Sequence, residues 1–161
     1  MDKILNINFV HLFVLYEIIW RNVMKKFNII IVYNYNNSKI LMCKRKKEPF
    51  KDKLNLVGGK IENDEDDLKA AYRELNEETG ITKENINLKH LINFDYLFQD
   101  MQLQVYMGKL RNQIELVEEV NELFWIEVTS DFWNVDKFAG DGNIWHMIKY
   151  SDNYINEFED S

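Results

Sequence analysis

The sequence predicts an α/β sandwich in which helices cover a mixed β-sheet. Runs of β-branched and aromatic residues recur along the chain, and two helical segments alternate with them. The 161 residues contain no repeat, no low-complexity tract and no linker long enough to separate two domains. A chain of this length can bury roughly two-thirds of its unfolded surface in a single core. We therefore expect one globular domain.

The first predicted strands are residues 27–35 and 39–45, with the sequences FNIIIVYNY and KILMCKR. The tripeptide Asn-Asn-Ser at residues 36–38 separates them, and these residue types favour a tight turn. The two runs therefore predict a β-hairpin. Pro49, the only proline, indicates a loop after the second strand.

A helix follows the run LNLVGG, and its ends are the clearest in the sequence. Asn63 or Asp64 is the predicted N-cap, the first turn is acidic as suits the helix dipole, and Gly80 is the predicted stop. Four apolar residues recur at the spacing of a buried stripe, so the helix should pack one face on the sheet. They are Leu68, Ala71, Tyr72 and Leu75.

The second half of the chain predicts three more strands and a last helix. Residues 90–98 and 103–110 form two strands joined across residues 99–100, and residues 123–128 form another. The last helix is expected from about residue 144 to residue 158, after the loop FAGDGN.

Residues 1–23 form an apolar N-terminal extension before this pattern begins. The run FVHLFVLYEIIW, residues 9–20, is broken only by His11 and Glu17. It is short for a membrane span, which needs about 20 residues, and it lacks a basic start and a small-residue cleavage site. A helix covering the domain and an upstream start with Met24 as the working start are the favoured alternatives, ahead of a membrane anchor.

Charge and cysteine content limit the partners and the compartment. The 20 basic and 27 acidic residues give a net charge of -7, which argues against binding a long nucleic acid, because phosphate neutralisation needs a basic face. A small anionic substrate would need a local cation. Cys43 is the only cysteine, so we expect no internal disulfide and a reducing, cytoplasmic location. The oligomeric state stays open, with a homodimer as one alternative.

Three glutamates lie close together on the acidic helix. Glu77 lies about 60° to one side of Glu74 and Glu78 about 40° to the other, so the carboxylates share an arc of roughly 100°. Like charges at this spacing repel each other unless a cation lies among them. A solvated acidic face is one interpretation, and a site for a hard cation such as Mg²⁺ or Mn²⁺ is the other.

The wider spacing of the segment favours the metal site. Its fixed residues are Gly59, Glu65, Arg73, Glu74, Glu77, Glu78 and Gly80, with apolar Leu75 and Ile81. This spacing resembles the Nudix box of the Nudix hydrolase family in its MutT-like form. With seven fixed residues at a frequency of about 7% each, a chance match at one starting point is roughly 10⁻⁸. The resemblance is strict over residues 59–81 and extends loosely over residues 24–154.

The resemblance implies a Nudix-type α/β/α sandwich over residues 24–161. It also implies Mg²⁺-dependent hydrolysis of a nucleoside diphosphate linked to another group, with Mn²⁺ as an alternative ion. Carried over by position, the metal ligands would be the carboxylates of Glu74, Glu77 and Glu78 and the backbone carbonyl of Gly59.

Four residues in or beside the box are expected to support the site. Glu65 lies about 180° from Glu74 when the helix is projected back, so we expect it to pair with Arg73 rather than bind metal directly. Gly58 lets the backbone approach a phosphate, and Lys60 can contact phosphate oxygens.

The general base is expected to be a glutamate outside the box. Glu119 lies six residues before Trp125, where MutT-like enzymes carry an additional carboxylate at the metal site. Nearby Glu115, Glu118 and Glu122 are rivals for that place, and a solvated acidic turn is the alternative interpretation.

Substrate recognition is expected from residues outside the box. Arg45 ends the second strand, where MutT-like enzymes place an arginine near the substrate phosphate. The run LNLVGGK resembles the N-G-x-G-G-K entrance of oxidised-purine nucleoside triphosphatases, with Asn55 at their base-reading asparagine and Leu56 in place of the first glycine. An amide can both donate to and accept from a purine edge. A turn residue at a strand edge is the alternative interpretation of Asn55. Asn143 is a second candidate for base contact, or alternatively the N-cap of the last helix.

Three functions are compatible with the sequence. Hydrolysis of 8-oxo-dGTP or a related purine nucleoside triphosphate to monophosphate and pyrophosphate is favoured. A second alternative is hydrolysis of another diphosphate, such as a dinucleoside polyphosphate, a nucleotide sugar or ADP-ribose. Tyr96 stands where ADP-ribose hydrolases usually carry a proline, which favours dinucleoside polyphosphates over ADP-ribose. The third is a non-catalytic nucleotide-binding Nudix domain.

Overall fold

The computed structural model describes residues 24–158. The predicted N-terminal extension, including the apolar run at residues 9–20, lies outside this range. Within residues 24–158, no helix has the length and apolar character to cross a membrane.

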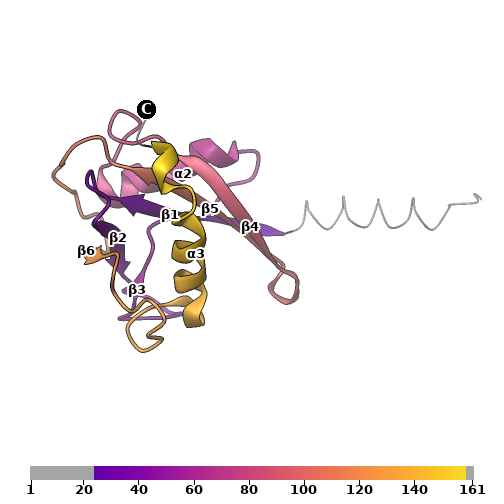
Figure 1. The fold of residues 1–161 in the computed structure, drawn as a ribbon. Helices are drawn as coiled ribbons and strands as arrows, with labels where there is room; N and C mark the ends of the chain where they lie inside the picture. The colour runs from indigo at the N-terminus through magenta and orange to yellow at the C-terminus, as the bar shows by residue number, and fades with distance from the viewer. Residues whose placement is uncertain (1–23, 159–161) are drawn as a thin grey trace, which may run out of the picture.

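A six-stranded mixed sheet forms the centre of the fold (Figure 1). Its main path has the order β3-β2-β1-β5-β4, and β6 pairs with β2 off this path. β1 and β5 run parallel, and the other pairs are antiparallel, as a mixed sheet requires. The strands are β1 (Lys25–Tyr33), β2 (Lys39–Lys44), β3 (Leu54–Asn55), β4 (Lys89–Tyr96), β5 (Met101–Lys109) and β6 (Glu122–Glu127).

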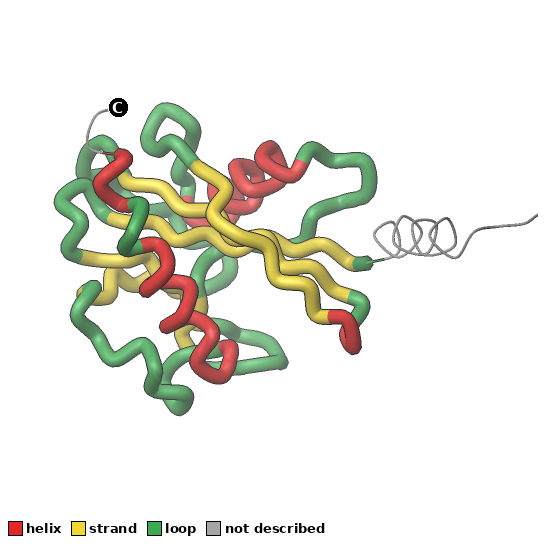
Figure 2. Tube along the Cα trace, turned by 45° about the vertical axis from the view of Figure 1, so that its right-hand side comes forward, coloured by secondary structure: helices red, strands yellow, loops and turns green. Residues whose placement is uncertain are grey.

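One main helix covers each face of the sheet, which gives the predicted α/β/α sandwich (Figure 2). The helix α2 (Asp67–Thr79) buries Ala71 and Leu75 against a core cluster that includes Ile30 and Val32 of β1. The helix α3 (Asn143–Ser151) packs on the opposite cluster. Because side chains alternate along β1, its even-numbered residues from 28 to 32 face α2 and its odd-numbered ones face α3.

Helix α2 begins later than the sequence predicts, so the N-cap prediction of Asn63 or Asp64 is wrong. Asp66 is the N-cap, and its side chain accepts a hydrogen bond from the backbone N–H of Lys69. The preceding residues form a turn instead, in which Asp64 has a φ of 65° and the N–H of Glu65 donates to the carbonyl of Glu62. The predicted stop at Gly80 is confirmed, since its φ of 75° is left-handed and its N–H caps the helix.

The buried stripe of α2 also differs from the prediction at its first turn. Leu68 stays 41% exposed, whereas Ala70 is fully buried. In the first turn Asp67 contacts the sheet instead, since Gln104 of β5 donates to its carboxylate at 2.6 Å and Lys26 pairs with the same group. An apolar side chain gains little by packing there.

The last predicted helix is interrupted. α3 ends at Ser151, and a separate 3-10 turn, η3 (Ile155–Phe158), follows a short connection. The buried Ser151 hydroxyl bonds the Ile148 carbonyl and the Tyr33 hydroxyl, which fixes the helix end against the sheet. The N-cap of α3 is Gly142 with a φ of 92°, so the alternative that Asn143 is the cap is wrong.

Candidate active site

The two glycines before α2 place the backbone directly against the acidic helix. Gly58 has a φ of 140°, and its N–H donates to the Glu78 carboxylate at 2.9 Å. A Cβ at Gly58 would overlap the Asn28 carbonyl, and one at Gly59 would overlap the Glu74 carboxylate. A side chain at Gly58 would therefore force the backbone apart, and one at Gly59 would displace the Glu74 carboxylate.

Asn28 of β1 holds Gly59 in place, and sequence reasoning did not identify it. Its backbone N–H donates to the Gly59 carbonyl at 2.8 Å, and its side-chain oxygen accepts from the Gly59 N–H at 3.1 Å. The Asn28 side chain is buried, and its Nδ2 has no hydrogen-bond partner among the described residues. The feature of the sequence that could have indicated this role is a single amide residue inside the apolar run of β1. The Gly59 carbonyl keeps one lone pair for another donor or an ion.

Arg73 is the cation that lies among the glutamates in this structure. Its guanidinium binds Glu65 through two hydrogen bonds of 2.9 and 3.0 Å, so the predicted pair is present. It also bonds Glu74 at 2.7 Å and Glu77 at 3.0 Å, and it donates to the Lys60 carbonyl. Arg73 therefore ties the loop to three carboxylates of the acidic segment.

The hydrogen bonds of Arg73 change the ionisation of its partners. The Arg73 guanidinium lowers the pKa of Glu65, and the bonds to Glu65 and Glu74 raise the pKa of Arg73. Burial raises the pKa of Glu74, although Arg73 opposes the shift. The Glu65–Arg73 pair is thus held as a carboxylate and a cation.

Glu78 has a different environment from Glu74. Burial is the largest cause of its raised pKa, and the negative charges of Glu74 and Glu119 raise it further. The Gly58 N–H and the Arg45 charge act in the opposite direction. A carboxylate that is buried and lies beside other acids gains from a nearby cation, which would remove the repulsion.

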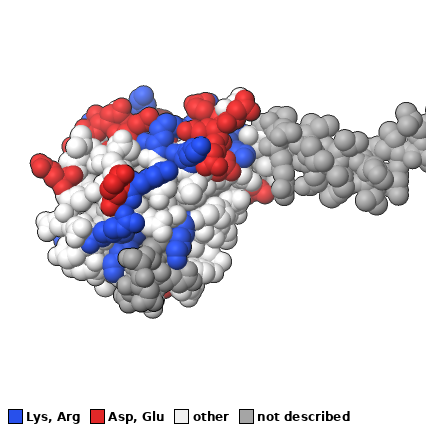
Figure 3. Space-filling view, turned by 90° about the horizontal axis from the view of Figure 1, so that it is seen from above, with Lys and Arg blue, Asp and Glu red and all other residues white. Residues whose placement is uncertain are grey.

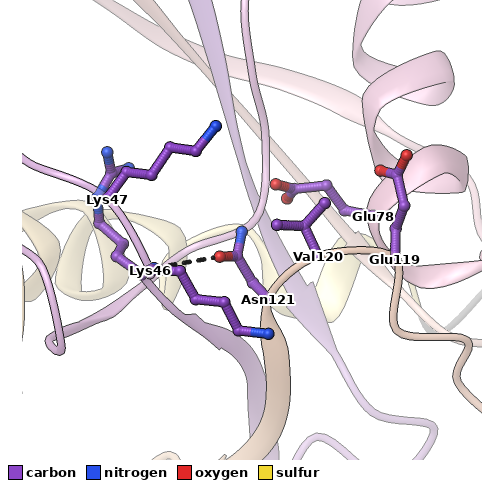
Figure 4. Close-up of a pocket in the computed structure, with 7 residues that line it drawn as sticks. Lys46, Lys47, Glu78, Glu119, Val120 and Asn121 are labelled. Atoms are coloured by element: carbon purple, nitrogen blue, oxygen red, sulfur yellow. Dashed lines mark hydrogen bonds between the residues drawn. The ribbon is translucent and has the colours of Figure 1, made fainter.

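A pocket of about 220 Å³ opens beside Glu78. Figure 4 shows basic side chains on one side of it and Glu78 and Glu119 on the other, with Val120 and Asn121 between them. The pocket brings together three residues that the sequence predicts for the site, namely Arg45, Glu78 and Glu119. Lys46, Lys47 and Asn121 also line it, and sequence reasoning did not single them out.

Among the four rival glutamates, Glu119 has the position nearest to the predicted site. It lines the pocket with Glu78, and its charge affects the Glu78 pKa. The Glu118 carboxylate instead accepts from the backbone N–H of Leu123 at 2.9 Å. Glu115 and Glu122 do not line this pocket.

The donor set has the chemistry of a hard-cation site, but the ligands are not gathered in advance. Within residues 24–158, no group of three or more His, Cys, Asp or Glu side chains is arranged to hold a metal ion. Glu74 and Glu77 are engaged by Arg73, and Glu78 by the Gly58 N–H. The carboxylate and carbonyl oxygens fit Mg²⁺ or Mn²⁺. Arg73 engages one oxygen of Glu74 and one of Glu77, which leaves the second oxygen of each carboxylate for an ion.

The remaining predicted residues lie around this centre rather than in one cluster. Asn55 pairs with Cys43 across β2 and β3, so its side chain is on the α2 face, and no hydrogen bond of this side chain is present among the described residues. The Asn143 amide lies at the start of α3 and donates to the Tyr96 hydroxyl at 3.4 Å. The Lys60 ammonium pairs with Glu62 at 2.9 Å. Asn55 and Asn143 are therefore attached to different faces of the sheet.

Charged side chains of both signs occupy the face shown in Figure 3. The acidic side chains gather in groups, and basic side chains lie between them. This face offers local cations within an acidic molecule, which suits a small anion better than a long polyanion.

Comparison with known proteins identifies the class to which this fold and site belong. A family model described as a NUDIX domain matches residues 24–139, well over half of the chain. The chain therefore belongs to the Nudix family. It is a Nudix pyrophosphohydrolase that acts on diphosphate substrates, and enzymes of this family generally use divalent metal ions.

Several solved structures share the fold. An Ap4A hydrolase from C. elegans in a binary complex is 18% identical with a TM-score of 0.66, over 82% of this chain and 99% of that chain. A MutT structure from work on Aliivibrio salmonicida and Vibrio cholerae is 19% identical with a TM-score of 0.61, over 81% and 99%. A MutT/nudix family protein from Enterococcus faecalis is 22% identical with a TM-score of 0.57, over 65% of this chain and 44% of that chain.

This chain thus spans less than half of the Enterococcus faecalis protein. At these identities the three likenesses show the fold alone. No curated protein matches the sequence.

Proposed function

We propose that this Nudix enzyme carries out Mg²⁺-dependent hydrolysis of a purine nucleoside triphosphate, 8-oxo-dGTP or a related compound, to the monophosphate and pyrophosphate. The observation that carries the proposal is the pocket that Glu78, Glu119 and Arg45 line together. Figure 4 shows its two carboxylates opposite Lys46 and Lys47. A carboxylate side can hold a metal ion and a basic side can hold phosphate oxygens, so the pocket suits a metal-bound phosphate chain. The single, buried cysteine is consistent with a cytoplasmic location.

The metal would be held by the carboxylates of Glu74, Glu77 and Glu78 and by the Gly59 carbonyl, with Mn²⁺ as an alternative to Mg²⁺. When bound, such an ion supplies charge neutralisation at the diphosphate and a lowered pKa for water. Glu65 would keep Arg73 anchored whether or not the ion displaces Glu74 and Glu77 from it, because its two hydrogen bonds to the guanidinium do not involve them. Asn28 would keep the Gly59 carbonyl oriented through its two backbone-directed bonds.

The other residues of the pocket would bind and orient the reactants. Arg45 would offer its Nη groups to a phosphate, because its Nε already donates to the Pro49 carbonyl at 2.8 Å. Glu119 is exposed to solvent and lies on the pocket side of a loop, so it can accept a proton from an attacking water molecule as a general base. Gly58 and Lys60 flank the site and can contact phosphate oxygens.

Asn55 is the residue we assign to recognition of the purine. Its amide lies on the same face as Cys43 and has no hydrogen bond of its own among the described residues, which leaves both its donor and its acceptor available. Asn143 is a weaker candidate, since its amide already donates to Tyr96.

A dinucleoside polyphosphate is the second candidate substrate. Tyr96 favours it, because this tyrosine occupies the place where dinucleoside polyphosphate hydrolases often carry one, and its hydroxyl is paired with Asn143. The fold likeness to the C. elegans Ap4A hydrolase is consistent with this alternative.

A product-release assay distinguishes the candidates. The full chain is incubated with Mg²⁺ and a panel of modified purine triphosphates, pyrimidine triphosphates, dinucleoside polyphosphates, nucleotide sugars and ADP-ribose, and the products are separated by ion-exchange chromatography. The proposal predicts a purine triphosphate as the best substrate, with pyrophosphate as a product. A preference of tenfold or more for a dinucleoside polyphosphate or a nucleotide sugar would overturn it.

A further inference from the structure

The basic side of the active-site pocket extends beyond the arginine that the sequence predicts. Lys46 and Lys47 lie opposite Glu78 and Glu119 (Figure 4), and Arg45, the residue before them, lines the same pocket. The chain carries a net charge of -7, so three adjacent cations facing the acidic helix are a local reversal of its charge. Their position in the pocket favours a ligand that carries several negative charges along its length.

Neither lysine is neutralised by an acid among residues 24–158. Lys46 and Lys47 form no ion pair among the described residues, whereas Lys26, Lys39 and Lys60 each pair with an acid. An ammonium that lines a pocket without a carboxylate partner can bind an anion without first breaking an ion pair. The two lysines are therefore available to a ligand.

The backbone that carries the lysines is fixed by hydrogen bonds. The Lys46 N–H donates to the Asn121 side-chain oxygen at 3.3 Å, which joins this loop to the loop of Glu119. Arg45 exchanges two backbone hydrogen bonds across the same loop, with Lys53 at 3.0 Å and with Asp52 at 2.8 Å. The long side chains move, but their points of attachment are set relative to the carboxylate side.

We propose that Lys46 and Lys47 bind a phosphate group beyond the two that lie at the metal and Arg45. This inference rests on the proposed function, because the carboxylate side must first hold the metal-bound diphosphate. A phosphate chain that starts at Glu78 and crosses the pocket reaches the two ammonium groups next, and each can donate to a separate phosphate oxygen. The substrate class is thus a nucleotide with three or more consecutive phosphates, and the lysine pair selects for chain length.

Selection for the length of the phosphate chain separates the candidate substrates. ADP-ribose and nucleotide sugars contain two phosphates, so they would leave both lysines without a ligand group. A nucleoside triphosphate and a dinucleoside tetraphosphate would both fill the site. The base-recognition residues then decide between these two classes.

The test replaces both lysines by glutamine, which keeps much of the side-chain length and removes the charge. The substrates are a purine nucleoside triphosphate, the matching diphosphate and ADP-ribose, all with Mg²⁺. For the K46Q/K47Q double variant we expect kcat/KM on the triphosphate to fall by roughly 10- to 100-fold, mainly through KM. On the two-phosphate compounds we expect a change of less than about threefold, because no phosphate reaches the lysines.

A matched control removes two positive charges outside the pocket. Lys51 and Lys69 are exposed and do not line it, so the K51Q/K69Q double variant should keep the wild-type ratio of triphosphate to diphosphate hydrolysis. An equal loss in both double variants would mean that net charge alone attracts the substrate. An equal loss of K46Q/K47Q on all three substrates would mean a structural role. Either result overturns the proposal.

A binding measurement separates this proposal from the proposed function. Calorimetry with inorganic triphosphate and pyrophosphate, each with Mg²⁺, should show tighter binding of triphosphate to the wild type and equal binding of both to K46Q/K47Q. If the enzyme hydrolyses no nucleotide but shows this difference, the proposed reaction fails and the phosphate site stands. If triphosphate and pyrophosphate bind the wild type equally, the phosphate site is refuted whatever the activity.

Discussion

Replacing Glu78 by glutamine tests the proposed ligand assignment with the least change in shape. Glu78 is half-buried and accepts a hydrogen bond from the Gly58 N–H at 2.9 Å. A glutamine oxygen can still accept this bond, although it is a weaker acceptor than a carboxylate, at a cost of about 1 kcal/mol. Against that cost, the neutral amide avoids the unfavourable burial that raises the Glu78 pKa. We therefore expect the free energy of unfolding without metal to change by no more than about 1 kcal/mol.

Glu78→Gln should lower the activity strongly, although it should change the stability little. Removal of a ligand charge from the metal should lower kcat by at least about 10²-fold, equivalent to about 2.7 kcal/mol of transition-state stabilisation. The assay is steady-state hydrolysis of a purine triphosphate with saturating Mg²⁺, beside a thermal melt of the metal-free protein. Glu62→Gln is the matched control, because Glu62 is exposed and pairs only with Lys60 on the surface, and it should lose less than about twofold.

Two results would refute the reasoning. Equal losses of activity in Glu78→Gln and Glu62→Gln would remove the ligand assignment, and so would full activity in both. A Glu78→Gln protein that melts far below the wild type would show that this carboxylate is needed for the fold instead.

Three further predictions concern recognition, the N-terminal segment and pH. Asn55→Ala should cost about 1–3 kcal/mol, or roughly 5- to 150-fold in kcat/KM, for 8-oxo-dGTP and little for a pyrimidine triphosphate; a uniform fall across bases would indicate a structural role. A chain that begins at Met24 should fold and keep its activity, and an insoluble or inactive product would contradict this. Burial raises the pKa of both Glu74 and Glu78 above the ordinary value of 4.5, so the folded protein takes up protons more readily than the unfolded chain as the pH falls toward 4.5. The metal-free protein should therefore become more stable as the pH falls toward 4.5. The increase in Tm caused by Mg²⁺ should shrink over the same range, because protons compete with the ion. An increase in Tm that is equal at pH 7.5 and pH 5.5 would argue against these ligands.

Much of the fold could be predicted from the sequence because local signals agreed with the final packing. The hairpin of β1 and β2 follows from two apolar runs around a turn, and Gly80 ends α2 because only glycine readily takes its left-handed conformation. The start of α2 could not be predicted in the same way. Several polar residues precede the helix, and the choice of Asp66 depends on the long-range contacts of Asp67 with Gln104 and Lys26.

The site shows the same division between local and long-range information. The spacing of the glutamates placed them on one helix, and the pairing of Glu65 with Arg73 followed from the helical projection. That Arg73 also binds Glu74 and Glu77 was not predicted, because a helical wheel gives side-chain directions and not the reach of a guanidinium. The pocket side formed by Arg45, Lys46 and Lys47 depends on how two distant loops meet at Asn121, which no local pattern contains.

The most direct test of the central claim is the identity of the products formed from 8-oxo-dGTP with and without Mg²⁺. The full chain, the substrate and either Mg²⁺ or a chelator are incubated together, and the phosphorus-containing products are separated and quantified. The account predicts 8-oxo-dGMP and pyrophosphate in equal amounts with Mg²⁺, no turnover with the chelator, and loss of turnover in Glu78→Gln. Turnover that persists with the chelator, or release of single phosphates in place of pyrophosphate, would contradict it.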